Sequence, residues 1–270
     1  MLHESISDAE FNRFRGFIYD HAGIRLSDDK KILVTSRLSK RLRHYSITSF
    51  GTYFDLMTEL GREKEQQIAI DLLTTNETSF FREPKHFEFI TNEIIPKINR
   101  NKRYRVWSAA SSTGKEAYSL AMLLDDKFNN TLWEILGSDI NHTVLQEAML
   151  GLYQQDRIDG IPMDYLRKYC LKGKDEFEGK LLIIKRLIDR VNFIYVNLTS
   201  TLPLDELGTF QLILLRNVLI YFDAETKSQI IKKVVLTLES GGFLFIGHAE
   251  SLKGFTHGLI RISSSIYKKP

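Results

Sequence analysis

The chain has 270 residues, 43% of them hydrophobic, which is enough for one large core or for two domains. Its 37 Lys and Arg against 34 Asp and Glu give a formal charge of +3, too small an excess to indicate a nucleic-acid-binding protein. Cys170 has no partner cysteine, and no apolar run is long enough for a signal peptide or a membrane span, so we expect a cytoplasmic protein without membrane insertion. The seven histidines form no HExxH or Cys/His cluster, so no metal site is expected.

The N-terminal part of the chain carries helical patterns. Ser7 and Glu10 are placed as a capping box, and apolar residues follow at helical spacing. Three further helices fit the sequence before residue 73, and no strand pattern interrupts them. Residues 1–73 are therefore predicted to form a small helical domain.

Beyond residue 100, short apolar runs alternate with helical patterns, which is typical of a mostly parallel sheet covered on both faces. An amphipathic helix is expected around residues 117–124 and a small inserted β element around residues 181–184. The main strands are expected at 105–107, 134–138, 193–196, 211–215 and 243–246.

Three features lie at the carboxyl ends of predicted strands, where open α/β sheets bind their ligands. They are the run of small residues at 109–114, Asp139, and the pair Arg216–Asn217. Gly114 allows a ligand to approach the backbone, and an acidic residue placed like Asp139 commonly holds ribose hydroxyls. An ordinary turn between a strand and a helix is the alternative interpretation of the small residues.

The number of glycines in that run favours one cofactor over others. NAD or FAD requires the pattern G-x-G-x-x-G to accommodate a pyrophosphate, and only one glycine is present. S-adenosylmethionine has no phosphate, and Glu116 could face its positive charge.

Six blocks in order resemble the chemotaxis receptor methyltransferases, the CheR family. They are 74–83 (TTNETSFFRE), 107–120, 138–153, 196–198 (VNL), 216–223 (RNVLIYFD) and 247–252 (GHAESL). The resemblance implies a class I S-adenosylmethionine-dependent methyltransferase domain of the Rossmann-like α/β type over 74–270. It also implies an all-helical N-terminal domain over 1–73 and an antiparallel β subdomain inserted at about 157–192.

The implied activity is methyl transfer from S-adenosylmethionine to glutamate side chains of bacterial chemoreceptors in chemotactic adaptation, with S-adenosylhomocysteine as the second product. The resemblance places Arg82 and Tyr221 nearest to the methyl transfer. The residues that it implies as cofactor contacts are Asn76, Thr78, Arg82, Glu116, Asp139, Asn197, Leu198, Arg216 and Asn217, beside Gly114 of the loop.

Two departures from the family pattern stand out. Lys115 replaces a Glu that is frequent in the family, and its charge would oppose the sulfonium unless its stem points to solvent. The run 172–175 (KGKD) lacks the second glycine of the members that dock on a receptor-tail pentapeptide, so the sequence leaves tail tethering open.

A carboxylate is ionised at neutral pH, so the reaction needs alignment rather than a base. Arg82 could hold the acceptor carboxylate with its planar fork, or could simply pair with Glu83. Tyr221 could contact the same carboxylate or pack under the strand end. Phe80 and His248 are interpreted as structural.

The second helix carries a local excess of positive charge on one side, in Arg37, Lys40 and Arg41. Such a face is either simply solvated or a docking surface for the acidic methylation helices of receptors. The alternatives to the predicted function are a methyltransferase for nucleic acid, protein nitrogen or another protein substrate, and a receptor-interaction module with little turnover. No nucleic-acid partner is expected, and the chain is expected to be monomeric.

Overall fold

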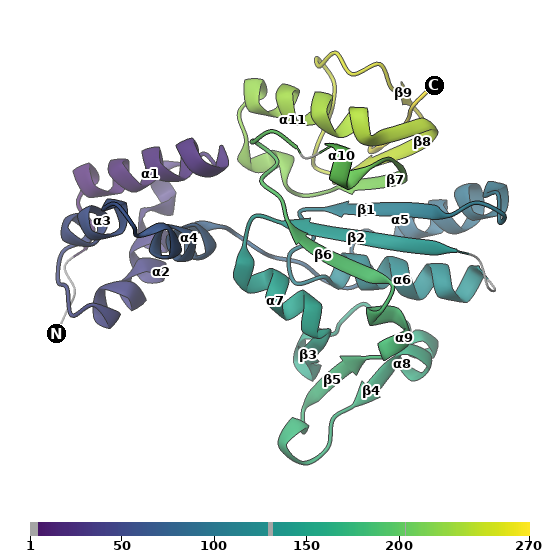
Figure 1. Cartoon of the computed structure of the whole chain (residues 1–270), viewed down its shortest axis with the longest axis horizontal. Coiled ribbons are helices and arrows are strands. Elements are labelled where there is room, and N and C mark those ends of the chain that lie inside the picture. Colours follow the sequence, from purple (N-terminus) through teal and green to yellow (C-terminus); the bar gives the residue numbers. More distant parts are fainter. Residues whose placement is uncertain (1–4, 129–131, 203) are drawn as a thin grey trace. The chain divides into compact units, whose positions relative to one another are not determined.

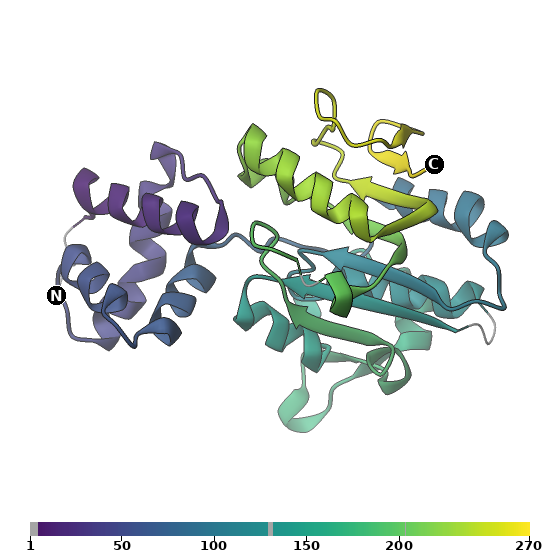
Figure 2. The same ribbon diagram turned by 45° about the horizontal axis from the view of Figure 1, so that its top comes forward.

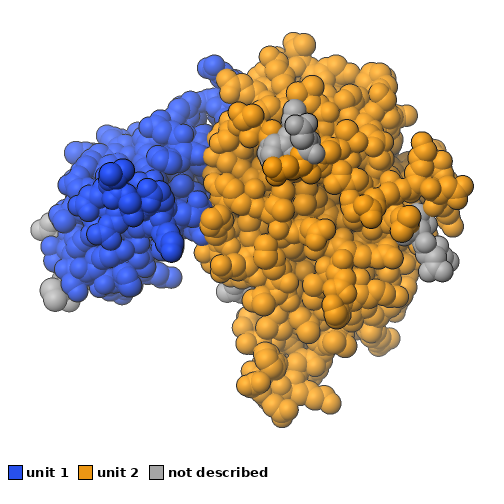
Figure 3. Space-filling view, in the orientation of Figure 1, with its two compact units in different colours: residues 1–75, 221–227 blue, residues 76–220, 228–270 orange. Residues whose placement is uncertain are grey.

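The computed structural model describes residues 5–128, 132–202 and 204–270 and divides into two compact units. Unit 1 comprises Met1–Thr75 and Tyr221–Lys227, and unit 2 comprises Asn76–Ile220 and Ser228–Pro270 (Figure 3). The division at Thr75 lies two residues beyond the expected boundary. Within the described residues, no helix is long and apolar enough to cross a membrane.

Unit 1 is helical. It contains α1 (Asp8–Ala22), a short 3-10 turn (Asp28–Lys30), α2 (Lys31–His44), α3 (Phe50–Thr58) and α4 (Glu63–Leu73). The predicted capping box is confirmed at the start of α1: the Ser7 Oγ accepts a hydrogen bond from the Glu10 amide at 3.2 Å, and Glu10 Oε2 accepts one from the Ser7 amide at 2.8 Å.

Unit 2 is built around a seven-stranded sheet with the strand order β6-β2-β1-β7-β8-β10-β9 (Figure 1). The strands from β6 to β8 are parallel to their neighbours, and the last two are antiparallel. Their bounds are β1 (Tyr104–Ala109), β2 (Trp133–Asp139), β6 (Val191–Tyr195), β7 (Phe210–Leu215), β8 (Leu238–Ile246), β9 (Ile260–Arg261) and β10 (Ile266–Lys268). The predicted mostly parallel sheet is confirmed.

The helices of unit 2 cover the sheet on both faces (Figure 2). They are α5 (Pro84–Phe89) with its π- and 3-10-helical continuation to Lys97, α6 (Lys115–Lys127), α7 (His142–Leu150), α8 (Met163–Tyr169), α9 (Lys185–Ile188), α10 (Leu204–Leu207) and α11 (Ala224–Thr237). The expected amphipathic character of α6 is wrong, because every residue from 117 to 124 is buried. Its two sides are covered by β2 and by α9.

A second, three-stranded antiparallel sheet projects from the main sheet (Figure 1). Its strands are β3 (Leu152–Gln154), β5 (Lys180–Ile183) and β4 (Cys170–Lys172), in the spatial order β3-β5-β4. The β element expected around 181–184 is therefore present as β5. The sheet starts at Leu152, five residues before the expected range of 157–192.

The strand order determines where a ligand can bind. The chain proceeds from β1 to β2 and β6 on one side and then returns to β7 on the other side of β1, so the order reverses between β1 and β7. In such sheets the crevice lies outside the carboxyl ends of the strands at the reversal. The loops after β1, β2, β6 and β7 all meet this edge.

Candidate active site

The loop after β1 is tied to the end of β2 by backbone hydrogen bonds. The Ser111 amide donates to the Ser138 carbonyl at 2.8 Å, and the Ser112 amide donates to Asp139 Oδ2 at 2.9 Å. Gly114 has a φ of +80° and packs so closely that a Cβ atom there would lie 2.8 Å from Phe193 Cζ. Only glycine fits this position, so the loop has one fixed shape.

Asp139 connects three strand ends. Its Oδ1 accepts a hydrogen bond from the Asn141 amide at 3.0 Å, and its backbone carbonyl accepts one from the Val196 amide, just beyond β6, at 3.0 Å. With the bond from Ser112, these contacts fix the carboxylate at the carboxyl edge of the sheet. Ser112, two residues before Gly114, thus joins the loop after β1 to the Asp139 carboxylate.

Asn197 and Leu198 lie two and three residues beyond β6, whose last residue, Tyr195, pairs with Asp139. Asn197 Oδ1 accepts hydrogen bonds from the amide and the hydroxyl of Thr199, at 3.0 Å and 2.7 Å. Lys233 of α11 donates to the carbonyls of Leu198, Thr199 and Ser200 at 2.7–2.9 Å. No pattern in the sequence indicates Lys233, which binds this loop from more than 30 residues away.

Arg216, at the end of β7, lies between two acidic residues. Its side chain is 1% exposed; Nη1 lies 3.0 Å from Glu116 Oε2, and Nη2 lies 3.1 Å from Glu83 Oε2. Nη2 also donates to the Arg82 carbonyl. The guanidinium expected to contact a cofactor is therefore held by protein groups.

Burial and neighbouring charges shift the pKa values of Glu116 and Glu83 in opposite directions. Burial raises the pKa of Glu116 above its usual value, although Arg216 and the Ser108 hydroxyl, 2.6 Å away, act in the opposite direction. Burial also acts to raise the pKa of Glu83, but the Arg216 charge and the bonds from His248 and Asn217 outweigh it and hold that pKa below its usual value. Glu83 is therefore ionised at neutral pH.

Arg82 is half-buried and does not pair with Glu83, because Arg216 does. Within the described residues, its guanidinium makes one hydrogen bond, from Nη1 to the Glu77 carbonyl at 3.0 Å. Tyr221 belongs to unit 1, where its carbonyl accepts a hydrogen bond from the Arg25 amide at 3.0 Å.

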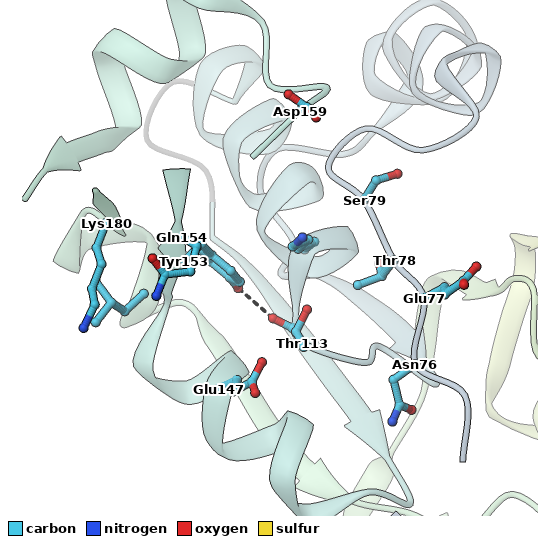
Figure 4. A pocket seen from close by; sticks show the side chains of 12 residues that line it. Asn76, Glu77, Thr78, Ser79, Thr113, Glu147, Tyr153, Gln154, Asp159 and Lys180 are labelled. Atoms are coloured by element: carbon cyan, nitrogen blue, oxygen red, sulfur yellow. Dashed lines mark hydrogen bonds between the residues drawn. The ribbon is translucent and has the colours of Figure 1, made fainter. Parts of the chain in front are cut away.

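A cavity of about 710 Å³ lies between residues 76–79, the start of α6, the end of α7 and the small sheet (Figure 4). Asn76 and Thr78 line it, together with Thr113 and Lys115. The Asn76 carbonyl accepts a hydrogen bond from the Ser112 hydroxyl at 2.8 Å, so this segment is joined to the β1 loop. Neither Asp139 nor Arg82 is among the residues that line the cavity.

Lys115 does not extend into solvent, since it is only 8% exposed. Its ammonium lies 5.8 Å from the ring centre of Phe80 and 5.9 Å from that of Tyr153, within the range of cation–π attraction. Phe80 is 2% exposed, which confirms its interpretation as a core residue.

His86 and His248 bring two imidazoles to Glu83, and three potential ligand atoms lie within 4.8 Å of one another. Glu83 Oε2 is 3.3 Å from His86 Nδ1 and 3.8 Å from His248 Nε2. A cation on this oxygen would face the buried guanidinium of Arg216 at 3.1 Å, so we assign no metal to it. Glu83 and His86 were not predicted as site residues, although Glu83 belongs to the quoted block 74–83.

In unit 1, the three residues predicted for receptor docking differ in their surroundings. Arg37 Nη1 donates to the carbonyls of Leu72, Leu73 and Thr74 at the end of α4, at 2.6–3.3 Å. Arg41 forms a two-point ion pair with the buried Glu65, at 2.8 Å and 2.7 Å. Lys40 is exposed, as are Arg43 and His44.

The parallel sheet, the glycine-bearing loop after β1 and the acidic residue after β2 define an α/β enzyme of the class that binds a nucleoside cofactor at the carboxyl edge of its sheet. Two family models match the chain. The all-alpha domain of the CheR methyltransferases matches residues 9–74, and their SAM-binding domain matches residues 76–268.

Known relatives agree with these matches over nearly their whole length. The chain is 38% identical to the chemotaxis protein methyltransferase of Escherichia coli over 94% of this chain and 87% of the relative. It is 36% identical to that of Salmonella typhimurium (97% and 91%) and 35% identical to that of Borreliella burgdorferi (99% and 96%). The chain belongs to the CheR family of S-adenosylmethionine-dependent protein methyltransferases.

The residues around the β1 loop fit this cofactor. Any side chain at Gly114 would collide with Phe193 and Ala148, so glycine lets the loop pack against these residues at the edge of the sheet. The hydroxyls of Ser111 and Thr113 are buried and have no hydrogen-bond partner among the described residues, so both can bond to a polar ligand. When bound, S-adenosylmethionine supplies a methyl group on a positively charged sulfur.

Proposed function

We propose that this protein methylates glutamate side-chain carboxylates of chemoreceptors and forms glutamyl methyl esters. In this proposal Asp139 holds the ribose hydroxyls, Gly114, Asn76 and Thr78 surround the amino-acid end of the cofactor, and Asn197 and Leu198 border its base. Glu116, Arg216 and Asn217 complete the site from the β7 side. The expected cytoplasmic location agrees with a substrate on the cytoplasmic methylation helices.

The observation that best supports the proposal is the set of partners around the Arg82 guanidinium. The two nearby carboxylates, Glu83 and Glu116, are both paired with Arg216, and the one hydrogen bond recorded for the Arg82 guanidinium among described residues goes to a backbone carbonyl. Arg82 thus keeps a positive charge that no carboxylate among the described residues neutralises by an ion pair. A planar guanidinium of this kind suits an incoming carboxylate, which it can hold through two parallel hydrogen bonds.

The chemistry needs no proton transfer. A glutamate carboxyl with an ordinary pKa near ~4.3 is already an anionic nucleophile at neutral pH. By holding one carboxylate oxygen, Arg82 turns the other toward the methyl group, and orientation of this kind supplies ~7–11 kcal/mol of the barrier reduction. Methylation of lysine would instead require a base to remove a proton, and no step here calls for one.

Two observations support a chemoreceptor as the protein substrate. The relatives that match the chain over most of their length are named chemotaxis protein methyltransferases. In addition, Lys40, Arg43 and His44 form an exposed basic patch on α2, which suits an acidic receptor helix. The proposal requires neither nucleic acid nor a second copy of the chain.

The experiment is methyl transfer from labelled S-adenosylmethionine to the signalling domain of a chemoreceptor, followed by mild alkali. Carboxyl methyl esters are hydrolysed and release the label, whereas N-methyl groups keep it. We expect label on the receptor that alkali removes, and none when Asp139→Ala replaces the wild type. Alkali-stable label would indicate methylation of nitrogen, and no label with folded, cofactor-binding protein would indicate an interaction module.

A further inference from the structure

The backbone around Arg82 is strained. Phe81 and Glu83, on either side of it, have φ values of 50° and 60°, in the left-handed region that residues other than glycine rarely adopt. Asn217, at the facing end of β7, has a φ of 58°. Such a conformation persists only where its surroundings determine it.

The surroundings that determine it converge on Glu83. Its Oε1 accepts hydrogen bonds from Asn217 Nδ2 and from the His248 amide, both at 3.2 Å. Its Oε2 is paired with Arg216, which in turn donates a hydrogen bond to the Arg82 carbonyl. One carboxylate therefore connects two strained segments, 81–83 and 217, with the loop after β8.

A second set of bonds holds the other ends of these segments. The Phe81 amide donates to the Ser119 hydroxyl of α6 at 2.9 Å, and Ser119 is fully buried. The Asn217 amide donates to Glu250 Oε2 at 3.0 Å, and the same oxygen accepts the Gly247 amide at 2.6 Å. The strained turn at Arg82 is thus fixed on both sides by buried polar groups.

We propose that Glu83 is a positioning residue for methyl transfer, which acts through Arg216 and Asn217 to hold Arg82 in the orientation that receives the acceptor carboxylate. This inference rests on the proposed role of Arg82 as the group that binds the acceptor. It assigns to Glu83 a part in turnover and no direct contact with the cofactor. A neutral side chain at 83 would leave Arg216 paired with Glu116 alone and release the Arg82 carbonyl to move.

The test compares Glu83→Gln with the wild type by separating turnover from binding. Gln keeps the size of the side chain and its acceptor for Asn217 but loses the charge that pairs with Arg216. We expect kcat to fall by up to about a hundredfold, since a misplacement of about 1 Å can cost that much. The dissociation constant for S-adenosylhomocysteine, measured by calorimetry, is expected to change much less than kcat.

Glu134→Gln is the matched control. Glu134 also forms a partly buried pair with a guanidinium, that of Arg105, but on β1 and β2 away from the carboxyl edge. Loss of this pair is expected to lower the melting temperature without lowering kcat. If Glu83→Gln does not fold, Ser119→Ala removes the bond to the Phe81 amide and is expected to lower kcat more mildly, again with a smaller change in the affinity for S-adenosylhomocysteine.

An unchanged kcat in folded Glu83→Gln would overturn the inference, as would an equal fall of kcat in Glu134→Gln. The wild type is assayed first, so a failure of the proposed function appears there as missing or alkali-stable label. In that case a crystal structure of Glu83→Gln still decides the positioning role: an unmoved Arg82 with φ values at 81 and 83 still positive contradicts it.

Discussion

Gly114 is the residue at which backbone conformation and close packing coincide. Its φ is +80°, and a Cβ would lie 2.8 Å from Phe193 Cζ and 2.9 Å from the Ala148 Cβ. We expect Gly114→Ala to lose at least about 1–3 kcal/mol of stability from overpacking and to weaken S-adenosylhomocysteine binding. Calorimetry of binding and urea unfolding measure the two effects.

Gly241→Ala is the control that separates the backbone strain of a positive φ from the steric collision at Gly114. Gly241 also has a φ of +80°, but nothing lies within 4 Å of a Cβ built there. It is expected to lose some stability and to keep its affinity for S-adenosylhomocysteine. Equal loss of affinity in both variants would mean that the packing at Gly114 does not shape the cofactor loop.

His86 predicts a dependence of stability on pH. Burial, together with the charges of Arg216 and His248, lowers the pKa of His86 to about 4, although Glu83 acts in the opposite direction. Because the folded pKa lies below the unfolded value of about 6.5, the unfolded chain takes up the proton first as the pH falls. The stability is complete above about pH 6.5 and is lost progressively down to about pH 4.

Between pH 7 and pH 5, this residue alone is expected to lower the free energy of unfolding by roughly 2 kcal/mol. Urea unfolding at both pH values measures it. His86→Gln is expected to reduce the difference by that amount. A pH dependence that is the same in His86→Gln as in the wild type contradicts the assignment.

The sequence was sufficient to place the predicted site residues at the ends of strands, but it did not indicate residues that act through tertiary contacts. Gly114 and Asp139 could be predicted because their positions after β1 and β2 determine their place. The role expected for Arg216, by contrast, changes once Glu83 is known to lie against it. That contact joins positions 133 residues apart in the chain, and no local pattern indicates it.

At the scale of elements, the basic residues of helix α2 fall into two groups. Some form ion pairs within the fold, and others are exposed and can contact a partner. Arg41 is 18% exposed and pairs with Glu65, which is 5% exposed and also accepts hydrogen bonds from Tyr45 and Tyr53. Arg41→Glu, a change at one of the predicted docking residues, would remove the partner of a buried carboxylate and cost about 3–5 kcal/mol. It would report on folding rather than on docking.

Substitutions at the exposed residues of α2 test receptor docking without removing an ion pair of the fold. We expect Lys40→Glu and Arg43→Glu each to lower kcat/KM for a receptor fragment at low salt by roughly tenfold, because opposite charges accelerate the encounter. Affinity for S-adenosylhomocysteine is expected to stay unchanged. Lys64→Glu, an equal charge change at an exposed position of α4, serves as the control.

The effect of Lys40→Glu is expected to shrink as salt is raised, since exposed charges are screened within about 10 Å at ~0.1 M. Rates that are the same for Lys40→Glu and wild type at low salt would remove α2 from the docking surface. An equal loss in Lys64→Glu would mean that net charge, rather than this patch, matters.

At the scale of the whole molecule, the alternation of strands and helices was sufficient to predict the class of fold. It did not predict the short strands β3, β9 and β10. Strands β9 and β10 are two and three residues long and pair antiparallel at the end of the sheet, too short for a recognisable period. Strand β3 follows Gly151 directly, so its residues resemble the end of α7. Each of these strands is determined by its partner rather than by its own sequence.

The central claim is that a receptor glutamate carboxylate, held by Arg82, takes the methyl group. Its most direct test is mass spectrometry of a receptor signalling domain after incubation with the protein and S-adenosylmethionine. We predict one methyl group on glutamate side chains, and a large loss of turnover in Arg82→Ala with S-adenosylhomocysteine affinity retained. Methyl groups on lysine or arginine, or full turnover in Arg82→Ala, would contradict the account.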